Sequence, residues 1–540
     1  MTVMSVRQGG FGGILATDQY QLTMAQLYWK EALADRTAQY DYFFRSYPDY
    51  GTHQAGYCIA AGMGWLLQWM EETRFEDADI AALGEQTDLH GKKRFDNGFL
   101  AWLSDHGDFS AVEIDAILEG RVVHSNVPVA TIRGPLAMTQ ILETALLNHL
   151  NYPTLIATKA SRVKEAARGG LVLEFGMRRG PGSGTHAGSR AALIGGFDFT
   201  SNVALSQGVG FDPKGTHAHS MVQVFMALGE GELEAFRKFA RSYPDECIFL
   251  VDTIDVLESG VPNAITVFGE LDARGHRPVG IRLDSGDLAY LAIQSAMMLD
   301  QAGFEDVSIV LSSDLDELAI WQILSQIDAE APRYGLDPER LVGRLTFGVG
   351  TRLITSQGDS ALGGVYKLVA VGDETNEWVP AIKVSEDVMK IPAPGEKRVF
   401  RAYDKRGLAT ADVVALADEE PFDADVVELF HPHKDVYRTL ITAELSGVEE
   451  LLEPAFRQGL RQDGDPTIDV LRDRRNTDLE RLDPGVRRLV NPHIYHVSLT
   501  ARMKELQRQM VESALEDAKD LLDRDTSLDQ GSDGPSTVAG

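Results

Sequence analysis

The sequence predicts an α/β protein, a (β/α) barrel joined to an α+β domain. Between residues 170 and 352, short apolar runs of β type alternate with helical segments. Each run also ends in glycine or polar residues, and a barrel carries its chemistry at the carboxyl ends of its strands. A doubly wound sheet would instead gather such residues at one switch point. The runs lie at 171–179, 194–202, 215–220, 248–255, 279–290, 307–314 and 345–352, with helices at 232–242, 286–301 and 316–327.

The domains are predicted to follow one another along the chain. Residues 12–150 form the α+β domain, which begins with a helix over 16–29 and includes a hairpin-like pair of strands at 120–124 and 127–132. Helices are predicted at 136–150 and 152–168, with Pro153 at the break between them. The barrel covers 151–374, and a second α+β portion, packing on the first two domains, covers 375–498. An amphipathic helix covers 499–522, and the acidic tail 523–540 is predicted to be disordered.

The composition excludes several classes of protein. The 540 residues include 51 Lys and Arg against 81 Asp and Glu, a formal charge of -30, which argues against nucleic-acid or anionic-membrane binding. Only two cysteines are present, and no apolar run approaches the roughly 20 residues that cross a bilayer. We therefore expect a soluble, unprocessed protein of the reducing cytoplasm.

The run at 279–290 leads from a strand directly into charged residues. Asp287 is a natural N-cap for the helix that follows, and Gly286 allows a sharp turn. Arg282 and Asp284 have no such local role. They form either a buried pair that orders the turn or part of a functional site, and the polar ends of the neighbouring runs favour the site.

Two glycine-bearing turns, at 347–352 and 362–367, lie late in the predicted barrel, where such folds often bind phosphate through backbone N–H groups. Arginine and lysine accompany both turns, so we expect a phosphorylated ligand. No Gly-x-x-x-x-Gly-Lys-Ser/Thr motif is present, which excludes an ordinary P-loop. The side chains proposed to bind phosphates are those of Arg178, Arg179, Arg282, Arg352 and Lys367, and the carboxylates proposed to hold Mg²⁺ among them are Asp252, Asp284 and Asp287.

The motif Gly-Thr-His-Ala-His-Ser at 215–220 has three interpretations. A His-x-His pair on a barrel strand can bind zinc, as in a metal-dependent hydrolase, but this needs further histidines, and only His276 lies between His219 and His431. Both histidines can instead be structural. The third interpretation is that one imidazole is a nucleophile that accepts a phosphoryl group.

The order of motifs resembles that of the nicotinate phosphoribosyltransferase family over residues 14–500. The matching segments are 17–24, 151–159, 174–179, 196–203, 215–220, 281–287 and 347–351. The resemblance implies an irregular (β/α) barrel of the type II phosphoribosyltransferase kind joined to an α+β sandwich domain, in a homodimer with sites shared between subunits. It also implies the reaction of nicotinate with phosphoribosyl pyrophosphate to give nicotinate mononucleotide and pyrophosphate, with Mg²⁺ present and ATP hydrolysed in a coupled step.

The same resemblance implies roles for single residues. His219 is similar to the histidine that ATP phosphorylates, Arg282 to the arginine that meets the nicotinate carboxylate, and Asp284 to the acidic residue at the reacting centre. Phe175 resembles an aromatic residue that stacks on the pyridine ring, and Tyr20 one that reaches the ring from the other subunit. Asp287 is proposed for Mg²⁺. The remaining substrate-binding residues are Arg178 for pyrophosphate, Ser220 and Asp198 from the shared motifs, and Gly348, Gly350, Thr351, Gly363 and Gly364 for the 5′-phosphate.

Where the family usually has Arg-Arg-Ala-Gln-Gly, residues 178–182 are Arg-Arg-Gly-Pro-Gly, so the loop after Arg179 transfers least well. The C-terminal cysteine clusters of some relatives are also missing. Three alternatives stay open at this point. They are a nicotinamide phosphoribosyltransferase, which shares the Asp-Ser-Gly-Asp signature, a barrel that only binds phosphorylated metabolites, and a metal-dependent hydrolase.

Overall fold

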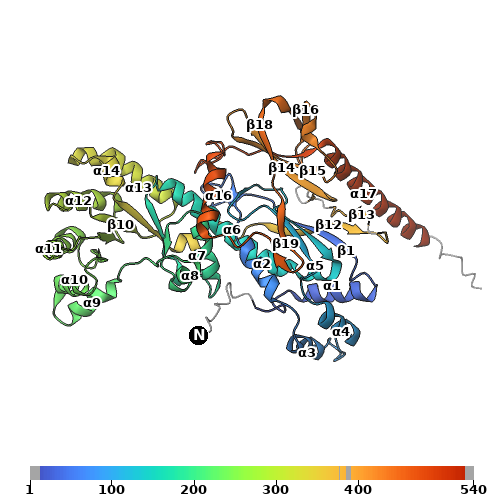
Figure 1. Cartoon of the computed structure of the whole chain (residues 1–540), viewed down its shortest axis with the longest axis horizontal. Coiled ribbons are helices and arrows are strands. Elements are labelled where there is room, and N and C mark those ends of the chain that lie inside the picture. The colour runs from blue at the N-terminus through green and yellow to red at the C-terminus, as the bar shows by residue number, and fades with distance from the viewer. Residues whose placement is uncertain (1–11, 376, 385–390, 530–540) are drawn as a thin grey trace, which may run out of the picture.

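The computed structural model describes residues 12–375, 377–384 and 391–529, with 517–529 as backbone only. Within these residues the strands form three large sheets and one small one (Figure 1). The first sheet is antiparallel and lies toward the N-terminal half of the molecule. Its strands, in spatial order, are β13 (Trp378–Pro380), β12 (Gly364–Gly372), β1 (Thr37–Phe44), β5 (Ala130–Pro135), β3 (Glu113–Ala116), β19 (Glu453–Arg457) and β20 (Leu460–Arg461).

This first sheet is built from three separate parts of the chain. The ranges predicted for the barrel and for the C-terminal portion return to it with β12 and β19, so the sequence ranges do not coincide with sheets. The strands at 120–124 and 127–132 do not pair as a hairpin, because β4 (Val122–Val123) pairs with β2 (Cys58–Ile59) while β5 joins β1 and β3. The helices of this half are α1 (Gln19–Lys30), α2 (Met63–Glu72), α3 (Asp77–Glu85), α4 (Asn97–His106) and α5 (Leu136–Ile141).

The predicted α/β barrel is present as an open, parallel sheet with helices around it. Its strands, in spatial order, are β7 (Phe199–Thr200), β6 (Leu171–Glu174), β11 (Leu345–Val349), β10 (Ser308–Ser312), β9 (Gly280–Leu283) and β8 (Ile248–Leu250). Its helices are α7 (Gly184–Ile194), α8 (Val203–Val209), α9 (His219–Ala227), α10 (Gly231–Ser242), α11 (Val261–Asp272), α12 (Leu288–Gln301), α13 (Glu317–Glu330), α14 (Pro338–Val342) and α15 (Thr351–Ile354), with short turns η1 (Met177–Arg179), η2 (Val256–Gly260) and η3 (Ala331–Tyr334). The helices predicted at 232–242, 286–301 and 316–327 are confirmed as α10, α12 and α13.

Helix α6 (Glu143–Ala166) runs between the first sheet and the barrel (Figure 1). It contributes Leu150 and Leu155 to the core of the first domain and Ala157 and Ala160 to the barrel core. The predicted break at Pro153 is wrong, because α6 continues through it and the break falls at Leu142. Pro153 lacks the N–H that would bond the His149 carbonyl, and the backbone of Gly62 packs closely against that carbonyl instead.

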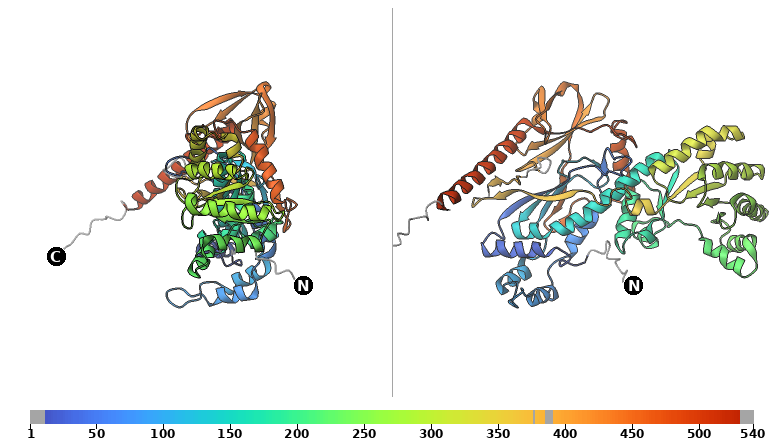
Figure 2. Two further views of the ribbon diagram at one scale, coloured as in Figure 1. Left: turned by 90° about the vertical axis from the view of Figure 1, so that its left-hand side faces the viewer. Right: turned by 180° about the vertical axis from the view of Figure 1, so that it is seen from behind.

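The C-terminal portion adds a third sheet and two helices. The sheet order is β17 (Tyr437–Ile441), β16 (Val426–Phe430), β21 (Val497–Thr500), β15 (Ala409–Leu416), β14 (Lys397–Asp404) and β18 (Leu445–Glu450), with η5 (Pro421–Asp423) and η6 (Thr442–Glu444) beside it. Helix α16 (Ile468–Glu480) packs against α7 of the barrel. Helix α17 (Ala501–Asp529) starts against β15, β16 and β21 and then projects from the body (Figure 2).

Helix α17 extends further than the predicted range of 499–522. Residues 523–529, predicted to be disordered, continue this helix, because no glycine or proline interrupts the chain before Gly531. The rest of the predicted tail, 530–540, lies outside the described residues.

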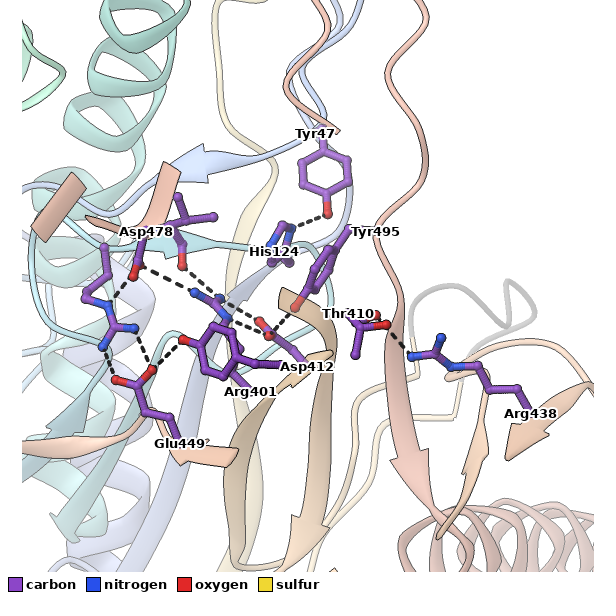
Figure 3. A network of polar contacts seen from close by, with 12 residues as sticks. Tyr47, His124, Arg401, Thr410, Asp412, Arg438, Glu449, Asp478 and Tyr495 are labelled. Carbon is purple, nitrogen blue, oxygen red and sulfur yellow. Dashed lines mark hydrogen bonds and ion pairs between the residues drawn. The ribbon is translucent and has the colours of Figure 1, made fainter. Parts of the chain in front are cut away.

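A buried polar network fastens the third sheet to the first domain (Figure 3). Arg401 on β14 donates two hydrogen bonds of 2.8 Å to Asp412 on β15 and one of 3.0 Å to the carbonyl of Val122. Tyr495 donates to the same Asp412, at 2.9 Å, and stacks on His124 of the first domain. Every large polar group here has a partner from another segment, so the C-terminal portion is an integral part of the fold.

Candidate active site

Arg282, Asp284 and their neighbours gather at the carboxyl ends of the parallel strands, as the sequence predicts. Arg282, on β9, donates from Nε to Ser312 Oγ at 2.8 Å, from Nη1 to Thr216 Oγ1 at 2.9 Å and from Nη2 to Asp284 Oδ1 at 2.9 Å. Its side chain is 15% exposed. Of the five guanidinium N–H groups, one on each terminal nitrogen is still available, and N–H groups on the two terminal nitrogens can together bind a carboxylate.

The ring of Phe175 lies beside this guanidinium, with 5.6 Å between its centroid and Arg282 Cζ. Phe175 follows β6 and donates its N–H to the Val349 carbonyl on β11 at 2.8 Å. A Cβ at Gly348 would lie 2.6 Å from two ring carbons, and one at Gly350 would lie 3.1 Å from the Phe175 carbonyl. Gly348 is therefore needed to seat the Phe175 ring, and Gly350 allows the two backbones to approach closely, a role separate from the phosphate binding predicted for both.

His219 begins helix α9 and points to the same edge of the sheet. Its Nε2 lies 2.9 Å from Asp252 Oδ1, and Ser285 Oγ donates to the other oxygen of Asp252 at 2.6 Å. A carboxylate only accepts hydrogen bonds, so Nε2 is the donor to Asp252, and Nδ1 is the ring nitrogen that Asp252 does not engage. The His219 side chain is 38% exposed while that of Asp252 is 3% exposed, so the imidazole is accessible on a buried support.

The predicted strand at 215–220 is wrong, because residues 211–218 form an extended segment without strand pairing that leads into α9. We name residues 211–218 the His219 segment. It lies between the two edge strands of the open sheet: Lys214 N–H donates to the Thr200 carbonyl on β7, and Leu250 N–H on β8 donates to His217 Nε2. Burial lowers the pKa of His217 to about 4, which keeps the ring neutral as this acceptor role requires. His217 is thus structural.

Behind Phe175 lies a buried carboxylate that sequence reasoning did not select. Glu174, at the end of β6, accepts hydrogen bonds from Ser189 Oγ at 2.8 Å, from Thr200 Oγ1 at 2.5 Å and from the Gly176 N–H. These contacts fix the turn that carries Phe175 and Arg178. The Glu-Phe-Gly motif contained this residue, but only the fold shows that three neutral donors converge on it.

The turn after β10 is strained. Ser313 and Asp314 have φ angles of 100° and 44°, and both are exposed next to Ser312, which donates to Asp284. Non-glycine residues rarely hold such angles, and they cluster at functional sites. The sequence signal available for this turn was the polar ending Ser-Ser-Asp.

Several predicted site residues have other surroundings. Asp198 precedes β7, accepts from Lys164 Nζ and from Val172 N–H at 2.7 Å each, and so braces the amino end of β6. Gly364 opens β12 in the first sheet, with its backbone against Asn151, so the 363–364 turn does not belong to the barrel as predicted. Asp287 caps α12 through Tyr290 N–H.

None of the others contacts the centre of the site. Arg178 is exposed on η1, Ser220 is exposed beside His219, and Thr351 starts α15. Tyr20 is 48% exposed on α1, which lies far from the barrel of its own chain (Figure 1). Over the described residues, no three His, Cys, Asp or Glu side chains are grouped to hold a metal ion. In the same residues no helix has the length and apolar character to cross a membrane.

Comparison with known proteins matches nearly the whole chain to one family. Models of the nicotinate phosphoribosyltransferase N-terminal domain, family and C-terminal domain match residues 15–151, 171–390 and 396–507. A nicotinate phosphoribosyltransferase of Bacillus subtilis is 37% identical over 90% of this chain and 92% of its own length. The chain belongs to the nicotinate phosphoribosyltransferase family.

An animal relative and a solved structure extend the match. A nicotinate phosphoribosyltransferase of Caenorhabditis elegans is 33% identical over 91% of this chain and 92% of its own. The crystal structure of human nicotinic acid phosphoribosyltransferase superimposes with a TM-score of 0.74 at 30% identity, over 91% of this chain and 99% of the human one. The family fold therefore includes the first sheet, the open barrel and the C-terminal portion together.

Proposed function

We propose that the chain joins nicotinate to the ribose of phosphoribosyl pyrophosphate, giving nicotinate mononucleotide and pyrophosphate for NAD biosynthesis, with coupled hydrolysis of ATP. The observation that carries the proposal is the pairing of Phe175 with Arg282. An aromatic acid can stack on the Phe175 ring while its carboxylate takes the two available N–H groups of Arg282. The names of the family relatives, which state the same activity, support this assignment.

The transfer itself needs charge placement more than proton transfer. The lone pair of the pyridine nitrogen forms a bond to C1 of the ribose, and the C1–O bond to pyrophosphate breaks with its electron pair leaving on pyrophosphate. Positive charge develops at C1 in between. Asp284 uses Oδ1 for Arg282 and Ser312, so Oδ2 can face that charge. Arg178, exposed on η1, would bind the departing pyrophosphate.

For ATP coupling, His219 is the proposed acceptor. Its Nδ1 lone pair bonds to the γ-phosphorus while the bond to the β-phosphate oxygen breaks, leaving ADP and a phosphohistidine. Water later cleaves the P–N bond to give orthophosphate and the free ring. Asp252 holds the Nε2–H throughout, and the N-terminus of α9 favours the added negative charge.

The residues present fit Mg²⁺ of the kind that binds with substrate phosphates. Such a site uses one or two carboxylates and leaves the other positions to phosphate and water, and the unused Oδ2 of Asp284 has this character. Asp287, predicted as a ligand, already caps α12, although its second oxygen is not used by the cap. When bound, Mg²⁺ would neutralise charge on the pyrophosphate.

We also propose a homodimer with shared sites. The loops and helix starts that follow β6, β7, β8 and β9 expose Met177, Val203, Ile254 and Tyr290 around the site. Tyr20 and Leu27 are exposed on the distant α1. A second copy would cover the apolar rim and would allow Tyr20 to reach the ring, as the resemblance implies.

The two unpaired cysteines, Cys58 and Cys247, are both buried, which suits a protein of the reducing cytoplasm.

The test is product formation from phosphoribosyl pyrophosphate and Mg²⁺ with nicotinate or nicotinamide, each with and without ATP, followed by mass spectrometry of the nucleotide. Nicotinate mononucleotide with a yield raised by ATP is expected. Nicotinamide mononucleotide would move the chain to the amide-specific alternative, and no nucleotide from either base would overturn the proposal.

A further inference from the structure

Helix α16, from the C-terminal portion, packs against α7 of the barrel and carries arginines that donate to backbone carbonyls of α7 and α6. We propose that Arg472 on this helix is a positioning residue that sets the His219 segment, and through it the presentation of His219. The proposal rests on the proposed function, because the expected consequence is a change in phosphorylation at His219.

Arg472 is joined to the chain on both sides of β7. Its Nε donates to the Leu193 carbonyl at the end of α7 at 2.9 Å, and its Nη2 donates to the carbonyls of Phe197 and Asp198 just before β7. The same guanidinium lies 4.8 Å from the ring centroid of Phe211, the first residue of the His219 segment. One partly buried side chain, 17% exposed, thus contacts both the support and the start of this segment.

From Phe211 onward, the segment depends on contacts with the barrel strands to keep its course. Lys214 N–H donates to Thr200 on β7, the strand that Arg472 fastens at its other end. Thr216 then contacts Arg282, and His217 contacts β8, before His219 starts α9. A shift of β7 or of Phe211 would therefore be passed along a short, irregular segment to the His219 ring.

The chemistry of Arg472 suits this role. Burial lowers its pKa, opposed by the charges of Asp469 and Asp198, so the guanidinium stays charged while it loses water. A desolvated guanidinium binds carbonyl oxygens and an aromatic face more strongly than a hydrated one does. A neutral side chain of similar length would lose the Phe211 contact and could not bond all three carbonyls together.

The neighbouring Arg474 gives a matched control. It is on the same helix, and its Nη1 donates to the Glu119 carbonyl of the first domain at 3.2 Å, away from the His219 segment. Arg474→Gln therefore removes an arginine and an α16 contact without touching β7 or Phe211.

The experiment compares Arg472→Gln, Phe211→Leu and Arg474→Gln with the wild type. It measures acid-labile phosphate incorporated from γ-labelled ATP with Mg²⁺, and ATP-independent nucleotide formation in parallel. We expect Arg472→Gln to slow phosphate incorporation about tenfold, since small misplacements of reacting groups are costly, and to change ATP-independent transfer by less than about threefold. Phe211→Leu should show a smaller loss in the same direction, and Arg474→Gln should match the wild type.

A second measurement does not depend on ATP. Diethyl pyrocarbonate modification of His219, localised by peptide mass spectrometry, should speed up severalfold in Arg472→Gln, because the ring leaves Asp252, while modification of the partly exposed His276 stays unchanged. Unchanged His219 reactivity in Arg472→Gln overturns the positioning role. The role is also overturned if phosphate incorporation and ATP-independent transfer both fall, and fall equally in Arg472→Gln and Arg474→Gln. If the wild type incorporates no phosphate, the phosphohistidine part of the proposed function fails, and His219 reactivity alone decides the role of Arg472.

Discussion

Three of the five N–H groups of Arg282 are bonded to the protein, and this fixes the plane of its guanidinium before any ligand binds. Lysine would keep the charge but could not hold Ser312, Thr216 and Asp284 together in one plane. Arg282→Lys should therefore raise the nicotinate KM about tenfold or more, since a charge-assisted hydrogen bond contributes about 1.5–3 kcal/mol. Initial rates at varied nicotinate, with phosphoribosyl pyrophosphate saturating, check this.

Arg277→Lys is the control for this substitution, because Arg277 is exposed just before the same strand β9, at its amino end. Its nicotinate KM should equal that of the wild type. An unchanged nicotinate KM in Arg282→Lys would remove the carboxylate-binding role from Arg282.

His219 is expected to act only in ATP coupling. His219→Asn should abolish the stimulation of nucleotide formation by ATP while leaving the slow ATP-independent transfer, because the pyridine nitrogen needs no protein base. The measurement is the ratio of initial rates with and without ATP. His276→Asn, at a histidine that contacts Asp245 on the surface, should keep the wild-type ratio. Equal stimulation in the His219 variant would contradict the assignment.

At the scale of the element, β11 tests how closely the backbone must approach Phe175. Gly348→Ala places a Cβ 2.6 Å from two carbons of the Phe175 ring, so the ring must move away from Arg282. We expect a nicotinate KM raised at least fivefold, with a loss of about 1–3 kcal/mol in stability from overpacking. Kinetics and urea unfolding measure the two effects.

Gly269→Ala, in α11 with open space around its Cβ, should leave activity unchanged and slightly favour the helix. If Gly348→Ala binds nicotinate like the wild type, the Phe175 ring does not need the position that it occupies here.

The alternation of strands and helices in the barrel could be predicted because each element has its own hydrophobic periodicity within a short stretch of sequence. The exceptions have non-local causes. The 363–364 turn carries the expected glycines, but β12 pairs with β1, more than 300 residues earlier in the chain. The His219 segment looks like a strand, yet its polar contacts with Thr200 and Leu250 replace strand pairing.

Site prediction had the same limit. Arg282, Asp284, Phe175 and His219 could be selected because they stand in motifs at strand ends, and the structure brings them to one edge. Asp198 stands in a motif too, but its carboxylate turns to Lys164. The support that Asp252 gives to His219, 33 residues away, could not be derived without the fold.

At the scale of the whole molecule, α6 and the C-terminal portion connect units that the sequence presents one after another. The two halves of α6 pack into different cores, and the Arg401 network ties the third sheet to the first domain (Figure 3). The candidate site is therefore supported by elements that lie outside it.

Glu317, at the start of α13, is the clearest case for a test of this support. Its fully buried carboxylate lies 2.7 Å from His53 Nε2 and 3.3 Å from Arg162 Nε, with Lys159 Nζ at 3.9 Å. Burial opposes its ionisation, but the hydrogen bond from His53 and the charges of Lys159 and Arg162 outweigh burial and lower its pKa to about 2. The ionised carboxylate is therefore stabilised in the folded state. At pH values above the unfolded pKa, this contributes roughly 3 kcal/mol to the free energy of unfolding, and the contribution is lost as the pH falls toward 2.

The free energy of unfolding of Glu317→Gln should consequently be about 3–5 kcal/mol lower than that of the wild type at pH 7, because the substitution leaves buried cations unpaired. The difference in free energy of unfolding between the two proteins should narrow steadily between pH 5 and pH 3. Over that range the wild type loses the stability contributed by its ionised carboxylate, whereas the amide does not ionise. Urea unfolding at pH 7, 5, 4 and 3 measures this. Glu505→Gln, which removes an exposed ion pair with Arg508 on α17, should follow the wild type at every pH. If the difference in free energy of unfolding between Glu317→Gln and the wild type stays constant from pH 7 to pH 3, the side chain acts through packing. Its charge then does not hold the first domain to the barrel.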